Sequence, residues 1–181
     1  VIGTTEQYQS VRQSPVESGQ FISALHVKNR STVAVLGSET KEELFGLRSP
    51  IGQSIRINGK QFRVIGVLAS KGGTFLGSLD DVVLIPITTA YYRLASQRTA
   101  QGEVVVQVIN VELADGAHKD NALQAIATIL RLRHRLTGDD DFTISSQQET
   151  IDALEDTTQS FVLFLGAIAG ISLLVGGIGI M

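Results

Sequence analysis

Cysteine is absent from the 181-residue sequence. Its absence excludes a disulfide framework and thiolate metal sites, although it does not define the compartment. The formal net charge of −3 argues against nucleic acid as a partner, because nucleic-acid-binding proteins carry a clustered basic surface. Residues 1–13 lack the basic and apolar stretches of a secretory signal peptide, so export of this region would require a signal upstream of Val1.

Catalytic motifs are also missing. The three histidines, at 26, 118 and 134, lack the spacing of metal ligands and are predicted to lie on the surface. Residues 71–78 are rich in glycine, but Lys71 precedes the glycines, whereas a phosphate-binding loop has its lysine after them. We therefore interpret this stretch as a mobile surface loop. The sequence predicts no catalytic residue, no cofactor and no enzymatic activity of its own.

Two clusters of aspartate raise the question of a metal site. Asp139, Asp140 and Asp141 are consecutive, without the alternating ligands and distal glutamate of a calcium-binding loop. Asp80 and Asp81 precede an apolar run. Both clusters are predicted to be solvated turns, and no metal is expected.

The sequence has no long apolar run before residue 160. A run of 22 residues without a charged side chain begins there. A helix of that length covers about 33 Å, enough to cross a hydrocarbon core of about 30 Å. The alternative is a buried core helix, which is usually shorter. Gly166 and Gly170 have the four-residue spacing that lets two membrane helices approach closely. We expect a transmembrane helix over 160–181, either ending a fragment or serving as a C-terminal anchor.

The polar segment before this run also has helical propensity. Ile151 and Leu154 are spaced by three residues, and neither proline nor glycine interrupts residues 147–159. We therefore expect a stalk helix over 147–159 that continues into the membrane helix.

Residues 1–92 are predicted to form a small mixed α/β lobe. The β-branched run 32–36 indicates a buried strand, and Asn58-Gly59 indicates a tight hairpin between strands at 53–58 and 61–68. Pro86 places the strand at 81–87 on a sheet edge or marks its end. The remaining predicted elements are a helix at 5–12, a turn at 18–19, a helix capped by Ser38 and ended by Gly46, and a helix at 90–95 capped by Thr88 and Thr89.

Residues 103–146 have the pattern of a strand, a helix and a return strand, at 103–113, 120–136 and 142–145. Such a β-α-β unit is too small to be stable alone, so we expect it to need a partner upstream of Val1. The predicted fold class is α+β, with two small mixed lobes followed by the stalk and the transmembrane helix.

Several strings of the sequence are distinctive together. They are VAVLGSETKEELFG at 33–46, PIGQSIRINGKQFRVIGVL at 50–68, DDVVLIPITTA at 80–90, RLRHRLTGDDDFTISS at 131–146 and ISLLVGGIGIM at 171–181. In this order the chain resembles the extracytoplasmic region of the macrolide-export permeases (MacB type) of the ABC transporters.

The resemblance implies a permease of the inner membrane with residues 1–159 outside the cytoplasm. Residues 1–92 would be the small inserted lobe, and 103–146 the returning segment of a porter-like lobe built from two chain segments. The implied partners are a cytoplasmic ATPase domain, a second permease copy in a homodimer, a periplasmic adaptor and an outer-membrane channel. ATP-driven closure would be transmitted mechanically through the stalk to drive export.

Two alternatives remain open at this point. One is a permease for lipoprotein extraction or for regulation of cell-wall hydrolases, which would share the membrane plan with a different client. The other is a membrane-anchored binding or sensor domain with a single helix.

Overall fold

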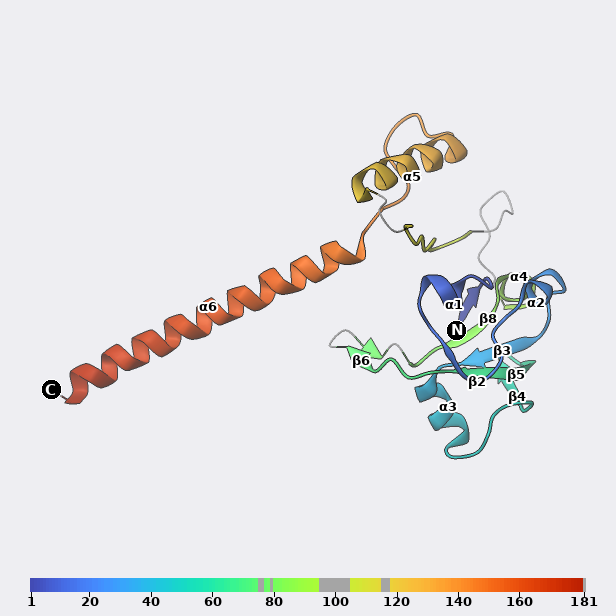
Figure 1. Cartoon of the computed structure of the whole chain (residues 1–181), viewed down its shortest axis with the longest axis horizontal. Helices are drawn as coiled ribbons and strands as arrows, with labels where there is room; N and C mark the ends of the chain where they lie inside the picture. Colours follow the sequence, from blue (N-terminus) through green and yellow to red (C-terminus); the bar gives the residue numbers. More distant parts are fainter. Residues whose placement is uncertain (75–76, 79, 95–104, 115–117, 181) are drawn as a thin grey trace. The chain divides into compact units, whose positions relative to one another are not determined.

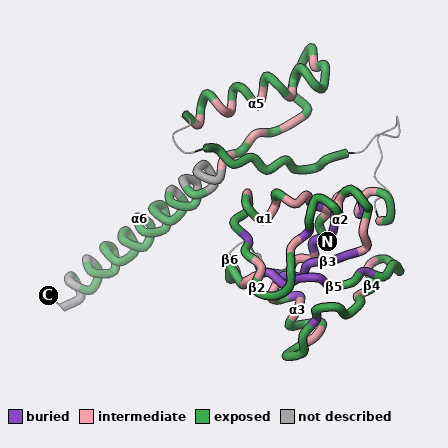
Figure 2. The backbone as a smooth tube through the Cα atoms, turned by 45° about the vertical axis from the view of Figure 1, so that its right-hand side comes forward, coloured by how far each residue is buried: buried purple, intermediate pink, exposed green. Residues whose placement is uncertain are grey.

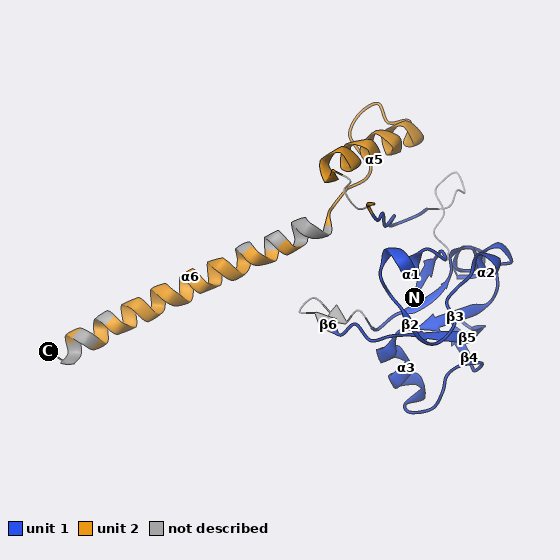
Figure 3. Cartoon of the chain, viewed as in Figure 1, with its two compact units in different colours: residues 1–112 blue, residues 113–181 orange. Residues whose placement is uncertain are grey.

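The β-branched run at residues 33–36 lies inside a mixed six-stranded sheet in the computed structural model (Figure 1). The structure describes residues 1–74, 77–78, 80–94, 105–114 and 118–180. Two units follow each other along the chain, Val1–Glu112 and Leu113–Met181 (Figure 3), and each is described by itself.

The sheet of the first unit has the strand order β1-β8-β3-β5-β2, with β4 paired to β5. The pairs β1–β8 and β3–β5 are parallel, and the pairs β3–β8, β2–β5 and β4–β5 are antiparallel. The strands are β1 (Ile2–Thr4), β2 (Val16–Gly19), β3 (Val33–Leu36), β4 (Ser54–Ile57), β5 (Lys60–Leu68) and β8 (Val83–Pro86). The long strand β5 therefore contacts three others and organises the sheet.

Both faces of the sheet are covered, which is why β3 and the second half of β5 are apolar without alternation. One face packs Val33, Val35 and Leu84 against side chains that include Tyr8 and Val27. The other face packs Ala34, Phe62 and Ile85 against side chains that include Ile55 and Leu94. Figure 2 shows the resulting buried stretch along β3 and β5.

Five short helical elements surround these strands: α1 (Tyr8–Val11), α2 (Ala24–Lys28), α3 (Ser38–Phe45), α4 (Ile87–Thr89) and the π-helical turn η1 (Ala90–Leu94). The prediction that Gly46 ends α3 is confirmed, and its φ is 57°. The predicted cap Ser38 is wrong, because Ser38 is the first helical residue and Gly37 is the cap position. Thr88 and Thr89 are not caps either: their hydroxyls donate to the carbonyls of Val27 and Ser31 and so fasten α4 to the end of α2.

The hairpin prediction is confirmed. Asn58 and Gly59 have φ values of 47° and 76°, both positive, as a two-residue turn that matches the strand twist requires. Ile57 pairs with Lys60 and Ile55 with Phe62 across the hairpin. The turn thereby fixes the register in which β4 pairs with β5.

Other predictions for this unit need correction. Residues 18 and 19 belong to β2 rather than to a turn, because Gly19 pairs with Gly66 of β5. A side chain at Gly66 would lie 2.3 Å from the carbonyl oxygen of Gln20, so only glycine permits this close approach. Pro86 ends β8 but does not mark an edge, since β8 lies between β1 and β3.

The predicted strand at 103–113 is wrong over the residues that the structure describes. Residues 105–114 have neither strand nor helix structure, and Val108 is 71% exposed. A strand needs a neighbour for its backbone hydrogen bonds, and none pairs with this segment within the described chain. The boundary expected between 92 and 103 falls mainly on residues 95–104, which lie outside the described residues.

In the second unit the predicted helix at 120–136 is present as α5 (Lys119–His134). The predicted return strand at 142–145 is wrong, because these residues have irregular structure. The expected β-α-β unit is therefore represented by its helix alone in the described residues.

A single helix, α6 (Gln147–Ile180), includes both the expected stalk and nearly all of the expected membrane run. Its 34 residues correspond to about 51 Å of helix. Over the part of the chain that the structure describes, no helix meets the combined length and hydropathy of a membrane span. The transmembrane assignment of 160–181 thus stays a prediction from the sequence.

Candidate functional site

The residues expected to act mechanically all lie on α6. Ile151 and Leu154 are 43% and 47% exposed, and they begin a stripe along one side of the helix. The stripe contains Ile151, Leu154, Glu155, Thr158, Gln159 and Val162. These positions follow the spacing of one helical face, so a neighbouring helix could contact them together.

Gly166 and Gly170 also lie on α6, one turn apart. A Cβ atom at either position would meet no other described atom within 4 Å, apart from the helix's own backbone. Both glycines therefore leave the backbone open to close approach by another helix. Phe161, Leu165 and Ile171 nearby are exposed as well, so the helix presents a large apolar surface.

Asp80 differs most from its prediction as a solvated residue. It is only 7% exposed, and its carboxylate accepts hydrogen bonds from the Ser70 hydroxyl at 2.6 Å and from the backbone N–H groups of Lys71 at 2.9 Å and Gly72 at 3.0 Å. The Ser70 bond, opposed by burial and aided by these N–H groups, lowers the pKa of Asp80. Asp80 thus fastens the base of a short hairpin, β6 (Gly73–Thr74) with β7 (Gly77–Ser78).

These hydrogen bonds of Asp80 act as a clamp on residues 70–72 and change the interpretation of the glycine-rich stretch 71–78. The region contains a β-hairpin where the sequence predicted a loop, although residues 75, 76 and 79 lie outside the described residues. The N–H groups of Lys71 and Gly72, which could have met a phosphate, already donate to Asp80. A sequence signal existed, because aspartate often bonds to nearby backbone N–H groups in turns.

The second aspartate cluster is not simply solvated either. Asp140 receives two hydrogen bonds of 2.7 Å from the Arg131 guanidinium, and Asp141 lies 2.8 Å from the His134 ring. The hydrogen bond from Arg131 lowers the pKa of Asp140, and the same bond raises the pKa of Arg131. The turn after α5 is therefore fastened to the last turns of that helix.

The remaining histidines have local roles. His26 completes a capping box with Ser23 at the start of α2, and His118 is the N-cap position of α5. No cluster of three histidine or acidic side chains suited to a metal is found among the described residues.

Comparison with known proteins identifies the family. The family model for the MacB-like periplasmic core domain matches residues 1–129. The chain belongs to this family. Among curated relatives, the macrolide export ATP-binding/permease protein MacB of Bdellovibrio bacteriovorus is 38% identical over 100% of the chain and 27% of the relative. The protein of the same name from Chlorobium luteolum is 40% identical over 99% of the chain and 26% of the relative.

Solved structures support the fold of a MacB-like periplasmic core domain. The periplasmic region of MacB from Actinobacillus actinomycetemcomitans matches with a TM-score of 0.68 and 23% identity, over 84% of this chain and 64% of that one. The extracellular domain of the transporter YknZ from Gram-positive bacteria matches with a TM-score of 0.53 and 19% identity, over 75% of this chain and 64% of that one. At these identities the structures establish the fold alone.

The extent of the match is informative in itself. The chain spans about a quarter of the length of the curated relatives. The family model ends at residue 129, inside α5, whereas the relatives align through α6. The expected resemblance to MacB-type proteins is therefore confirmed over the whole chain.

Proposed function

We propose that this chain is the extracytoplasmic region and adjoining membrane helix of an ABC transporter permease that exports small molecules. Membership of the MacB-like periplasmic core domain family supports this proposal, as do relatives named macrolide export ATP-binding/permease proteins. We place residues 1–159 outside the cytoplasm, on the outer face of the inner membrane. ATP hydrolysis is assigned to a cytoplasmic domain that these residues do not include.

The observation that carries the mechanism is the continuity of α6. Residues 147–159 would form the stalk and 160–181 the membrane span, in one helix without a break between them. A continuous helix keeps every internal backbone hydrogen bond, so displacement at one end can be transmitted to the other. ATP-driven closure in the cytoplasm would move the stalk, and the stalk would move the outer lobes that expel the substrate.

The open surfaces of α6 suggest what surrounds it. Gly166 and Gly170 would pack against a helix of a second permease copy, while Ile151 and Leu154 would contact a neighbouring stalk helix. A periplasmic adaptor and an outer-membrane channel would complete the path to the exterior.

Residues 103–146 would be the returning half of a porter-like lobe, and 1–92 the small lobe inserted into it. The exposed valines of 105–113 support this arrangement, because a strand from the remainder of the permease would bury them and pair their backbone. Neither alternative function, the other permease classes or a single-pass sensor, is favoured by a specific observation.

A proline substitution in the stalk tests the mechanism. Leu154→Pro in the full-length permease removes one helical hydrogen bond and clashes with the preceding turn, at about 3 kcal/mol or more. We expect basal ATP hydrolysis to stay largely intact while export of a macrolide from cells falls sharply. Leu154→Ala is the matched control, since it removes the same side chain but keeps the helix.

The two variants separate the possible outcomes. Equal loss of export in both would assign the effect to the leucine contact rather than to helix continuity. Normal export by the proline variant would contradict mechanical transmission and leave the domain as a passive docking surface.

A further inference from the structure

Most acidic side chains in residues 1–94 lie at one end of the sheet. The parallel strands β3 and β5 begin at the same end, where the antiparallel β8 finishes. No aspartate or glutamate occurs in residues 21–38, 44–67 or 82–94, which contain the starts of β3 and β5 and the end of β8. The acidic side chains of 39–43 and 80–81 instead lie where β3 finishes and β8 begins, which we call the acidic end.

One end of the sheet therefore carries a set of exposed cations, which we call the basic end. It consists of Lys28, Arg30, Arg56, Lys60, Arg63 and Arg93. None of the six forms an ion pair within the described residues. Glu6 follows β1 at the same end, but β1 is three strands away from β5 in the sheet.

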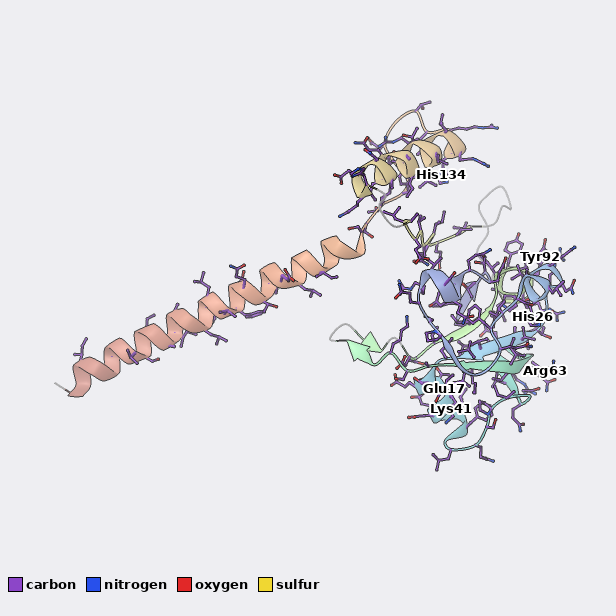
Figure 4. The ribbon with its side chains drawn as sticks, in the orientation of Figure 1. Glu17, His26, Lys41, Arg63, Tyr92 and His134 are labelled. Carbon is purple, nitrogen blue, oxygen red and sulfur yellow. The ribbon has the colours of Figure 1, made fainter. Side chains whose placement is uncertain are left out.

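Strand register places two of these arginines on one face of the sheet. Arg63 pairs with Val33 and therefore points to the same face, which Val27 of α2 helps to cover. Arg56 pairs with Gln61, two residues from Arg63, so both arginines lie on that face. Figure 4 shows Arg63, His26 and Tyr92 along one side of the unit, away from Glu17 and Lys41.

Arg30 is held in a defined position at this end. Its φ of 51° is stabilised by the bond from the Ser31 N–H to the His26 carbonyl at 3.0 Å. Its guanidinium carbon lies 3.7 Å from the centre of the Tyr92 ring, and Tyr92 packs edge-on against Tyr91. A guanidinium stacked in this way leaves its N–H edge available for a carboxylate.

We propose that the basic end is a docking surface for an acidic segment of another protein. Charge complementarity identifies the chemistry, because neither Arg30 nor Arg63 has a carboxylate partner among the residues that the structure describes. The residue types favour a protein over a lipid surface: four of the six cations are arginine, and Tyr92 is 54% exposed. Arginine and tyrosine are enriched at protein interfaces, where lysine is depleted.

The test uses the whole 181-residue chain in detergent micelles and a fluorescein-labelled decaglutamate peptide, with decaglutamine as the neutral control. Fluorescence anisotropy at low salt should show saturable binding of decaglutamate alone. We expect Arg30→Glu and Arg63→Glu each to weaken it about tenfold or more, as loss of a charge-assisted hydrogen bond implies. Lys41→Glu makes the same charge change on α3, at the acidic end, and should alter binding little.

Further variants separate docking from general charge attraction. Tyr92→Ala should weaken binding and Tyr92→Phe should preserve it, because only the ring is needed under the guanidinium. Arg30→Gln provides a neutral replacement should Arg30→Glu prevent folding. Equal loss in Lys41→Glu would overturn the proposal, and so would absence of decaglutamate binding. Arg30-dependent binding to phosphatidylglycerol vesicles without peptide binding would identify a lipid surface instead.

Discussion

Strand β5 and residues 105–113 have similar sequences but different structures. Both are rich in valine and isoleucine with polar residues interspersed. In β5 the side chains of Phe62 and Val64 are fully buried, whereas Val108 is 71% exposed. The difference lies in their neighbours, since β5 pairs with β2, β3 and β4 and residues 105–113 pair with no described strand. A β pattern thus becomes a strand only where a partner completes its hydrogen bonds.

The first prediction concerns the buried side chains of β5 and has the largest expected effect on stability. Phe62→Ala removes a fully buried ring between β4 and β8 side chains, and we expect it to lower the free energy of unfolding by about 3–5 kcal/mol. Val108→Ala is the matched control and should change it by less than about 0.5 kcal/mol. All three tyrosines lie in residues 1–94, so tyrosine fluorescence during urea unfolding reports on this unit alone. Similar losses in both variants would show that 105–113 already shares the core.

Asp80 provides the second prediction, with a smaller effect. Asp80→Asn places an amide donor against the N–H groups of Lys71 and Gly72, at a cost of about 2 kcal/mol. Asp81→Asn should cost much less, because Asp81 accepts one bond from the Thr40 hydroxyl, which can rotate. Urea unfolding at neutral pH measures both variants, and equal losses would show that Asp80 does not act as a clamp.

The same residue predicts a pH dependence. The folded-state pKa of Asp80 is lowered, so its stabilisation is complete above the unfolded value of about 3.9 and is lost as pH falls through the folded value. The stability difference between wild type and Asp80→Asn should be constant above about pH 5 and shrink in more acidic solution. A difference that grew on acidification would contradict the lowered pKa.

Phe62 and Asp80 show why prediction from the sequence succeeded for some features and failed for others. Phe62 lies in the hairpin around Asn58-Gly59, whose turn and register are encoded locally, so both could be predicted. Asp80 acts through Ser70, ten residues earlier, and that contact depends on a hairpin whose short strands have no clear pattern. The same limit explains why the predicted caps Ser38, Thr88 and Thr89 were wrong. The Ser38 side chain hydrogen-bonds Asp80, and the hydroxyls of Thr88 and Thr89 donate to the carbonyls of Val27 and Ser31.

The candidate site was predictable in position but not in surroundings. Ile151, Leu154, Gly166 and Gly170 could be placed on one helix because apolar length and the absence of proline are properties of the sequence. Their contacts depend on other chains or on the rest of a larger permease, and the local sequence pattern does not predict those contacts. Residues 105–113 illustrate the same limit, because their strand pattern and their need for a partner upstream of Val1 could be predicted, whereas the partner strand itself could not.

The smallest expected stability effect concerns the hairpin turn. Gly59→Val places a β-branched residue at a φ of 76° and should destabilise the first unit by at least about 1 kcal/mol. Gly138→Val, in the second unit, lies in open space without a left-handed φ and is the control. An unchanged urea midpoint for Gly59→Val would show that the turn rearranges freely and does not set the β4–β5 register.

Hydrogen–deuterium exchange of β5 and 105–113, followed by mass spectrometry, tests most directly whether 105–113 lacks a partner in this chain and gains one in the permease. In the 181-residue chain we predict slow exchange for the β5 amides and fast exchange for those of 105–113. In a full-length permease that contains this chain, the amides of 105–113 should become protected while β5 stays as before. Fast exchange of 105–113 in both proteins would contradict a completed porter-like lobe, and slow exchange in the chain alone would contradict the unpaired segment.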